Sequence, residues 1–199
     1  MSRIIRAIFI TLVLAVLIGG PWGYISYRDW TARNFHVVEP GVLYRSGQMP
    51  VRAFERIVHD YGIRTVICLR EGDQDNDLDE EKYCRRWGIN HVRIPPRAWW
   101  APRGPAPAEQ GLAVFRAVMD NRANHPVLIH CFAGLHRTGA YCAVYRMDYQ
   151  GWSNADALAE MKKLGYRTVD GEWDILTFLE GYRPGQENVI RPVSRSKRR

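Results

Sequence analysis

Cys131 and Arg137 are the residues whose types and spacing most directly predict chemistry. Five residues separate them, and the apolar segment Val127–His130 before the cysteine is typical of a short buried strand. Arg137 and Thr138 would open a helix. Backbone amides curled ahead of a helix N-terminus form a cradle for an anion, and an arginine guanidinium can bind two phosphate oxygens at once. The sequence therefore predicts a phosphate-binding loop that carries a cysteine.

The same loop would favour the thiolate form of Cys131. Amide dipoles, a helix N-terminus and a neighbouring cation stabilise a negative sulfur, and the thiolate is the nucleophilic form of cysteine. A thiolate beside a phosphoryl group is suited to in-line attack on phosphorus, which gives a phosphocysteine intermediate. Thr138 is placed to hydrogen-bond the sulfur and ease its departure when water attacks. The predicted phosphate-binding residues are Phe132, Ala133, Gly134, Leu135, His136, Arg137 and Thr138.

The segments around this loop predict an α/β domain with a central, partly parallel sheet flanked by helices, because strand and helix patterns alternate along the chain. Pro95–Pro107 interrupts the pattern with five prolines beside Trp99 and Trp100, and it predicts a long ordered loop or a lid. We expect strands at 35–38, 42–45, 63–69, 89–94 and 127–130, and helices at 51–61, 108–121, 137–150 and 172–180. We also expect a short helix carrying Leu78, Cys84 and Trp87 after an acidic loop over 70–77, and a helix that Ser153 caps and that runs to Leu164.

The net charge of +7 comes from the two ends of the chain. Arg3 and Arg6 carry two of these charges and residues 191–199 carry five, so residues 7–190 are formally neutral. A formally neutral domain has no basic excess to offer nucleic acid, and we expect no nucleic-acid partner. Cys68 and Cys142 lie in apolar patterns and are expected to be buried. The spacing of His125, His130 and His136 fits no common ligand pattern, and we expect no metal and no other cofactor.

Residues 7–25 predict an N-terminal transmembrane helix that acts as an uncleaved single-span anchor. Nineteen apolar or small residues are enough to cross a bilayer, and aromatic residues cluster at their far end. A cleaved signal peptide and a buried helix are the alternatives. Arg3 and Arg6 favour a cytoplasmic N-terminus and Arg28 and Arg33 oppose it, so the side of the domain stays open. We therefore divide the chain into an anchor and juxtamembrane segment (1–30), a catalytic domain (31–183) and a basic, disordered tail (184–199).

The loop resembles the signature of the cysteine-dependent protein tyrosine and dual-specificity phosphatases. The matching residues are His130-Cys131, five residues, and then Arg137-Thr138-Gly139. The segment Leu43–Gln48, with the sequence LYRSGQ, and His136 are similar to the atypical dual-specificity branch of bacteria, fungi and plants. The resemblance runs from about Phe35 to Leu164. It implies a protein-tyrosine-phosphatase-like fold behind the transmembrane helix, Cys131 as nucleophile and Arg137 as phosphate clamp.

Two departures from the family pattern bear on the chemistry. Many relatives carry Lys or Arg inside the loop, which favours highly anionic substrates, whereas this loop has Phe132 and Leu135. The family's general acid is usually an Asp on a mobile loop before the cysteine, yet Pro95–Pro107 contains no Asp or Glu. We favour Asp73 as the proton donor, because the strand at 63–69 should end at the same sheet edge as Cys131. The alternatives are Asp75 and Glu71; Trp99 and Trp100 either wall the pocket or pack in the core.

The sequence thus predicts a membrane-anchored, metal-independent phosphatase that hydrolyses phosphomonoesters on proteins or small molecules through a phosphocysteine intermediate. A catalytically weak phosphate-binding module is an alternative, because the usual acid is missing. A phosphoinositide or inositol phosphate phosphatase of the same fold is another. A sulfur-transfer domain also uses a loop cysteine, but the five-residue gap and Arg137–Gly139 argue against it.

Overall fold

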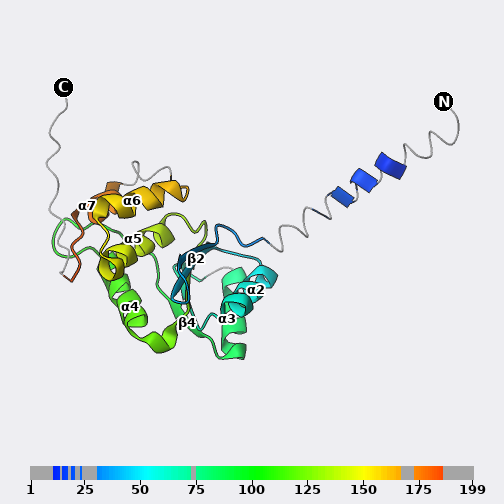
Figure 1. Ribbon diagram of the computed structural model, residues 1–199, viewed down its shortest axis with the longest axis horizontal. Coiled ribbons are helices and arrows are strands. Elements are labelled where there is room, and N and C mark those ends of the chain that lie inside the picture. The colour runs from blue at the N-terminus through cyan, green and yellow to red at the C-terminus, as the bar shows by residue number, and fades with distance from the viewer. Residues whose placement is uncertain are drawn as a thin grey trace, which may run out of the picture.

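The computed structural model describes residues 11–13, 15–17, 19–20, 23, 31–72, 75–166 and 173–185, without the side chains of residues 75 and 76. Within these ranges a five-stranded sheet lies between two groups of helices (Figure 1). The predicted α/β class is confirmed. The strands are β1 (His36–Glu39), β2 (Leu43–Gly47), β3 (Thr65–Cys68), β4 (Asn90–Arg93) and β5 (Val127–Cys131). The helices are α2 (Val51–Tyr61), α3 (Asp75–Trp87), α4 (Ala108–Asp120), η1 (Arg122–Asn124), α5 (Arg137–Gln150), α6 (Asn154–Lys163) and α7 (Trp173–Gly181).

The strand order is β1-β2-β5-β3-β4, and only the β1–β2 pair is antiparallel. The sheet is therefore mixed, as predicted. β5 lies in the middle, so both of its edges are paired, to β2 and to β3. Ligand sites in such sheets form where parallel strands end at their carboxyl termini, and this topology places the end of β5 at the centre of that edge.

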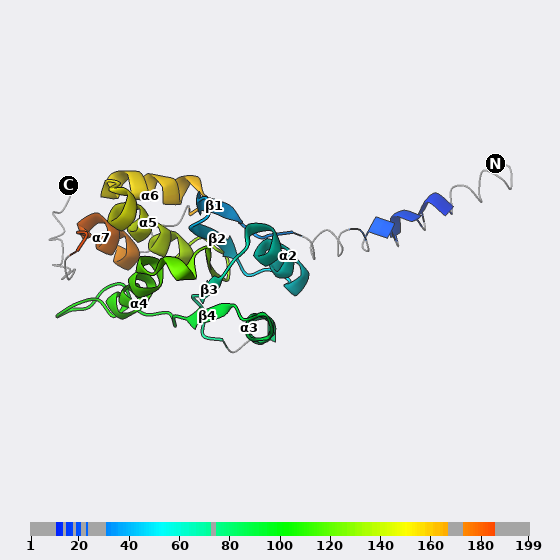
Figure 2. The same ribbon diagram turned by 60° about the horizontal axis from the view of Figure 1, so that its bottom comes forward.

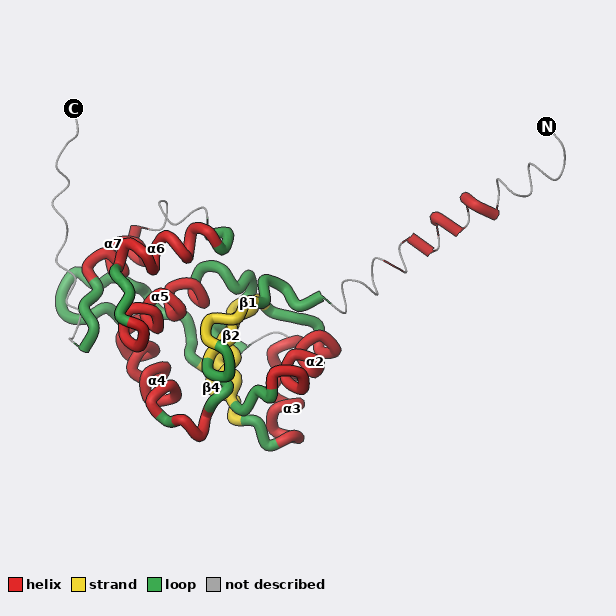
Figure 3. The backbone as a smooth tube through the Cα atoms, in the orientation of Figure 1, coloured by secondary structure: helices red, strands yellow, loops and turns green. Residues whose placement is uncertain are grey.

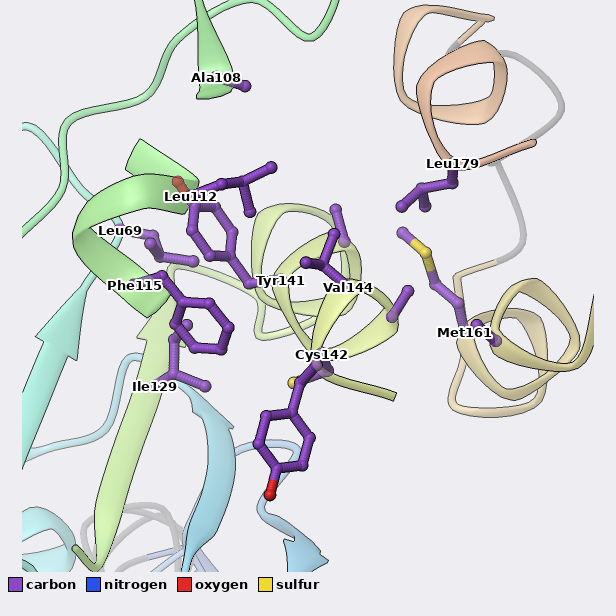
Figure 4. Close-up of a cluster of buried hydrophobic side chains, with 14 of the residues drawn as sticks. Leu69, Ala108, Leu112, Phe115, Ile129, Tyr141, Cys142, Val144, Met161 and Leu179 are labelled. Atoms are coloured by element: carbon purple, nitrogen blue, oxygen red, sulfur yellow. The ribbon is translucent and has the colours of Figure 1, made fainter. Parts of the chain in front are cut away.

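The two faces of the sheet are covered by different helices. Helices α2 and α3 lie on one face, and α4, α5, α6 and α7 lie on the other (Figures 2 and 3). Ile129 and Cys131 belong to the larger core under α4 and α5, whereas Leu128 belongs to the smaller core under α2. This alternation follows from the period of two along a strand. Figure 4 shows the larger core, where Leu69, Leu112, Phe115, Ile129 and Tyr141 lie together.

The local signals in the sequence account for most element ends. Gly62 ends α2 in the left-handed conformation (φ 60°), which costs glycine little, and the Ser153 side chain accepts a hydrogen bond from the Asp156 amide at the start of α6. The predicted loop over 70–77 is too long, because α3 begins at Asp75 and has 13 residues. Carboxylates are favoured in the first turn of a helix, and Asp77 is also buried in an ion pair with Arg70 at 2.9 Å.

The described part of the chain contains no helix long and apolar enough to span a membrane. Most of residues 7–25 lie outside the described residues, so the predicted anchor stays a prediction. The described chain ends at residue 185, so nearly all of the predicted tail also lies outside it. Cys68 and Cys142 are buried and free, as predicted.

Candidate active site

The strand β5 delivers Cys131 to the carboxyl edge of the sheet, and α5 begins six residues later at Arg137. Cys131 is buried, and its sulfur accepts a hydrogen bond from the amide of Gly134 at 3.2 Å. Gly134 has a φ of 74°, in the left-handed region that turns the loop back toward the cysteine. The predicted strand, loop and helix are therefore present, with an amide already directed at the sulfur.

Three successive carbonyl groups of the loop are held by residues from the chain around β1 and β2. The donors are backbone and side-chain N–H groups, and two of them come from the segment Leu43–Gln48 that suggested the atypical branch. Gln48 N donates to the oxygen of Phe132 at 3.0 Å, Asn34 Nδ2 donates to the oxygen of Ala133 at 2.8 Å, and Arg45 Nη2 donates to the oxygen of Gly134 at 2.6 Å. We call this set of contacts the carbonyl clasp.

The carbonyl clasp determines where the loop amides point. In a planar trans peptide the C=O group and the following N–H group point in opposite directions. When the carbonyls of residues 132–134 face the chain around β1 and β2, the amides of Ala133, Gly134 and Leu135 face away from it. The Gly134 amide does so and reaches the sulfur of Cys131. The same arrangement directs donors toward an anion that would sit beside the sulfur.

Gly47 and Gly134 allow the loop to approach β2 closely. A Cβ atom on Gly134 would lie 2.4 Å from the Gly47 nitrogen, and a Cβ atom on Gly47 would lie 2.8 Å from the Ala133 oxygen. Both contacts are with backbone, which cannot swing away as a long side chain can. Arg45, whose side chain donates to the Gly134 oxygen, is buried beneath this contact and is 1% exposed. Arg45 therefore has a structural role in the loop rather than an open position beside the pocket.

Arg137 lies at the mouth of the site. Its Nη1 donates to the backbone oxygen of Leu69 at 3.2 Å, which ties the guanidinium to the end of β3. Arg137 and His136 line a cavity of about 320 Å³ together with residues of the Pro-rich loop and of α7. The remaining lining residues are Pro96, Arg97, Ala98, Trp99, Asp174 and Ile175.

The two tryptophans of Pro95–Pro107 behave differently. Trp99 is buried, with edge-on ring contacts to Tyr141 and Phe178, and it also lines the cavity beside Arg137. Trp100 contacts Trp173 at the start of α7, with ring centroids 5.2 Å apart. The two predicted alternatives, pocket wall and core packing, are therefore both true of Trp99. Both tryptophans also join the Pro-rich loop to α7.

Phe132 is the exposed side chain of the loop, at 57% exposure. The guanidinium groups of Arg33 and Arg70 lie 4.7 Å and 5.5 Å from its ring centre. A guanidinium over an aromatic face is attracted by the negative charge of that face. Arg70 is also paired with buried Asp77, so its position is fixed from behind. These contacts place the exposed cation of Arg33 beside the loop, whereas the charge of buried Arg70 is compensated by Asp77.

Behind Cys131, on the opposite face of β5, His130 lies in a buried polar cluster. Its Nε2 is 2.8 Å from Glu80 Oε1, and His91 Nε2 lies 3.2 Å from the same oxygen. Burial alone would raise the pKa of the Cys68 thiol, but hydrogen bonds with His130 and His91 lower that pKa to about 7. Burial also opposes the charged forms of Glu80 and His130. Their mutual attraction outweighs it, so the pKa of Glu80 is lowered and that of His130 is raised.

The structure brings some of the predicted site residues together and leaves others apart. Cys131, Arg137 and the loop between them form one site. The Thr138 hydroxyl is buried and makes no hydrogen bond to a described residue, Cys131 included, so the predicted bond to the sulfur is not formed in this structure and only its role during the reaction stays a prediction. Among the acid candidates, Glu71 is described and is exposed. Asp73 lies outside the described residues, and the side chain of Asp75 is not described. The three histidines considered for a metal are dispersed, since His125 bonds the Met119 oxygen and His136 packs on Tyr166.

Sequence reasoning missed several residues around the site. Asn34 and Asp174 gave no signal, because each reaches the site from a segment far from the loop in sequence. Glu80 and His91 were missed because their positions depend on how α3 and β4 pack against β5.

Comparison with known proteins gives a consistent result. The tyrosine phosphatase family matches residues 31–188. The chain is 37% identical over 149 residues to the dual specificity protein phosphatase TpbA of Pseudomonas aeruginosa, covering 74% of this chain and 62% of that protein. It is 40% identical over 157 residues to the inositol diphosphatase DSP5 of Arabidopsis thaliana, covering 75% of this chain and 69% of that protein. The chain thus spans less than two thirds of the first of these relatives.

The crystal structure of TpbA from P. aeruginosa superposes with a TM-score of 0.60 at 24% sequence identity, covering 76% of this chain and 86% of that one. At this identity the likeness concerns the fold. It agrees with the mixed sheet and its two helical layers.

Proposed function

The chain belongs to the tyrosine phosphatase family, in its atypical dual-specificity branch of bacteria, fungi and plants, and we propose that it hydrolyses phosphomonoesters through a phosphocysteine intermediate. The observation that carries the proposal is the carbonyl clasp, because it holds the loop in the conformation in which the Gly134 amide bonds the sulfur of Cys131. A phosphoryl group in that position would meet a nucleophile, a ring of donors and the guanidinium of Arg137.

In the first step the thiolate of Cys131 attacks phosphorus in line with the bond to the leaving oxygen. The S–P bond forms as the P–O bond breaks, and the leaving group departs with the bonding electron pair. Arg137 and the loop amides bind the remaining phosphoryl oxygens and stabilise the charge that they carry in the transition state. This assigns Cys131 as nucleophile and Arg137 as phosphate clamp.

In the second step water attacks the phosphocysteine. A new P–O bond forms, the S–P bond breaks, and inorganic phosphate and the Cys131 thiolate are released. The Gly134 amide, which bonds the sulfur at 3.2 Å, would stabilise the departing thiolate, and we assign the Thr138 hydroxyl to the same task. The two steps together consume one water and regenerate the enzyme.

The leaving alkoxide needs a proton, and a positioned acid typically contributes about 10²–10⁴ in rate. Asp73 remains our candidate, since it follows the strand that ends beside the loop. Asp174 is a second candidate, because it is the one carboxylate among the described residues that line the cavity with Arg137. The two positions are on different segments, so substitutions at each separate them.

The substrate class that we propose is a phosphorylated protein or a small phosphomonoester. TpbA is named a dual specificity protein phosphatase, which supports phosphoprotein, whereas the relative named an inositol diphosphatase supports a phosphorylated inositol. Exposed Phe132 offers an apolar surface that suits an aryl group, and exposed Arg33 beside it offers charge for a further phosphate. A panel of phosphotyrosine peptide, phosphoinositide, inositol phosphate and inositol diphosphate under matched conditions ranks these classes by kcat/KM.

The decisive experiment compares the full chain, purified in mild detergent, with its Cys131→Ser variant on an aryl phosphate in the presence of EDTA. We expect turnover by the unsubstituted protein that resists EDTA, and loss to background in the variant. Turnover that survives the substitution would remove Cys131 from the mechanism. Absence of turnover on every member of the panel, with phosphate analogues still bound, would favour the catalytically weak binding module instead.

We propose that residues 7–25 anchor the enzyme in a membrane as a single span, with the catalytic domain at 31–183 beyond it. The support for this proposal is the length and apolar character of the segment and the aromatic residues at its end.

A further inference from the structure

Four side chains of the kinds that bind transition metals converge behind the catalytic loop. They are Cys68 on β3, Glu80 on α3, His91 on β4 and His130 on β5. One ligand atom each from Cys68, Glu80 and His130 lies within 4.8 Å of the other two. Glu80 Oε1 is 2.8 Å from His130 Nε2 and 3.2 Å from His91 Nε2, so both imidazoles meet at one carboxylate oxygen.

This cluster is shielded from water. Cys68 is fully buried, His130 is 1% exposed and Glu80 is 4% exposed. Polar groups are rarely placed in a protein interior without partners, and here Glu80 is the partner of both imidazoles, whereas the Nδ1 atom of His130 has no partner among the described residues. The phosphatase reaction as we describe it uses none of these four side chains directly, so the cluster is available for another role.

We propose that Cys68, Glu80 and His130 bind a divalent transition metal of the zinc class, and that His91, which contacts Glu80 at 3.2 Å, moves in as the fourth ligand. Thiolate, imidazole and carboxylate are the ligands that Zn²⁺ takes in proteins, with ligand distances that place tetrahedral neighbours about 3.3–3.8 Å apart. The observed spacings of 2.8 Å and 3.2 Å are shorter than the lower limit of this range by about 0.5 Å and about 0.1 Å. Small side-chain shifts would therefore open the cluster around an ion.

The donor set also selects the type of ion. Mg²⁺ and Ca²⁺ prefer sites made of oxygen atoms, whereas sulfur and nitrogen ligands favour Zn²⁺ and its neighbours. One carboxylate and one thiolate carry two negative charges, which balance a divalent cation in a buried place. Arg93 Nη1 lies 3.6 Å from the Cys68 sulfur and is itself paired with Glu81, so it would remain as a hydrogen-bond donor to the coordinated sulfur.

The site could not be read from the spacing of residues in the sequence. Its ligands come from four elements that are distant along the chain, and adjacent parallel strands β4, β3 and β5 bring three of them together. In the register of the sheet Cys68 lies opposite His130, on the face that α3 covers with Glu80. The proposal concerns metal binding alone and does not depend on the phosphatase reaction.

The test uses the full chain in detergent, with Cys131→Ser in every variant so that the loop thiol cannot bind the metal. Protein stripped with a chelator is incubated to equilibrium with Zn²⁺, or with Co²⁺ as a spectroscopic probe, freed of unbound ion and assayed for bound metal. We expect one ion per chain, a raised melting temperature, and the visible absorption of tetrahedral Co²⁺ with thiolate-to-metal charge transfer.

Cys68→Ala should weaken binding at least about tenfold and abolish the thiolate charge-transfer band. Cys84→Ala is the matched control, because Cys84 is a buried thiol one turn beyond Glu80 on α3 and is not among the converging ligands; it should keep the ion and the band. If Cys68→Ala does not fold, His91→Gln is the second variant, and it should also bind the metal more weakly than the Cys84→Ala control. No retained metal, or equal retention by the Cys68 and Cys84 variants, would overturn the proposal.

Discussion

At the scale of single residues, the catalytic loop depends on close backbone contacts as much as on its reactive groups. Gly134 has a left-handed φ, and a Cβ atom added to it would lie only 2.4 Å from the Gly47 nitrogen. Arg45 and Asn34 then hold the carbonyls on either side of this contact. The reactivity of Cys131 is thus expected to be sensitive to residues that never touch a substrate.

Gly134→Ala should lower kcat by at least about 10²-fold, because a displacement of about 1 Å in a reacting geometry costs this much. A left-handed alanine should also cost about 1–2 kcal/mol of unfolding free energy. Gly151→Ala is the control, since Gly151 has a similar φ of 66° but no atom within 4 Å of an added Cβ. It should lose the same strain energy and keep full activity. Aryl phosphate kinetics and urea unfolding measure both quantities, and equal activity in the two variants would contradict the close-contact argument.

The identity of the general acid leads to a second prediction at this scale. Substituting the true proton donor should reduce hydrolysis of alkyl phosphates by about 10²–10⁴ but reduce hydrolysis of aryl phosphates with good leaving groups far less. We expect this pattern for Asp73→Asn. If Asp174→Asn shows it instead, the donor comes from α7. Glu180→Gln, on the exposed far end of α7, controls for damage to that helix.

At the scale of elements, the carboxylate of Glu39 on β1 accepts two hydrogen bonds from α5, beside the bond from Arg146 to the Val38 oxygen. Glu39 Oε2 accepts hydrogen bonds from the Tyr145 hydroxyl at 2.5 Å and from Gln150 Nε2 at 2.7 Å. The bond from Tyr145 is the main cause of the lowered pKa of Glu39, and the bond from Gln150 adds to it. Because the folded-state pKa is lowered, the stabilisation is present above the ordinary value of 4.5 and is lost as pH falls through the lowered one.

Tyr145→Phe should therefore lower the unfolding free energy by about 1–2 kcal/mol near pH 7, as expected for a hydrogen bond to a charged group. The difference from the unsubstituted protein should shrink as the pH falls below 4.5. Urea unfolding across this range measures it. Tyr61→Phe serves as the control, because the described part of the chain shows no hydrogen bond of its hydroxyl. A difference that stays constant down to low pH would show that Glu39 is not the partner that matters.

The elements also show what the sequence could and could not predict. Strand and helix patterns are local, so β1, β2, α2 and α5 were predicted within two residues of their ends. The beginning of α3 was missed because Asp75 and Asp77 look like loop residues until Arg70 is seen to pair with Asp77. The catalytic loop was predicted because its chemistry lies in one continuous segment. The carbonyl clasp was not, because Asn34 reaches Ala133 across 99 positions of sequence.

At the scale of the whole molecule, the anchor proposal makes a direct prediction. The full chain should sediment with membranes and resist extraction by high salt or alkaline carbonate, because an apolar span is held by burial in hydrocarbon rather than by charge. A variant lacking residues 1–30 should appear in the soluble fraction. Release of the full chain by salt alone would instead indicate attachment through the basic tail, which is screened by ions.

The hydrogen bond from Asn34 to the loop has a consequence for the working distance of the enzyme. Only nine residues, 26–34, separate the end of the apolar segment from Asn34. A fully extended chain covers at most about 3.3–3.6 Å per residue, so these nine residues reach about 30 Å. If residues 7–25 cross a bilayer, Asn34 lies at most about 30 Å from the membrane surface. Cys131 then lies within that distance plus the short distance from Asn34 across the loop. Substrates embedded in or docked on the bilayer would lie within this distance, and a soluble substrate would have to diffuse to the surface to be dephosphorylated.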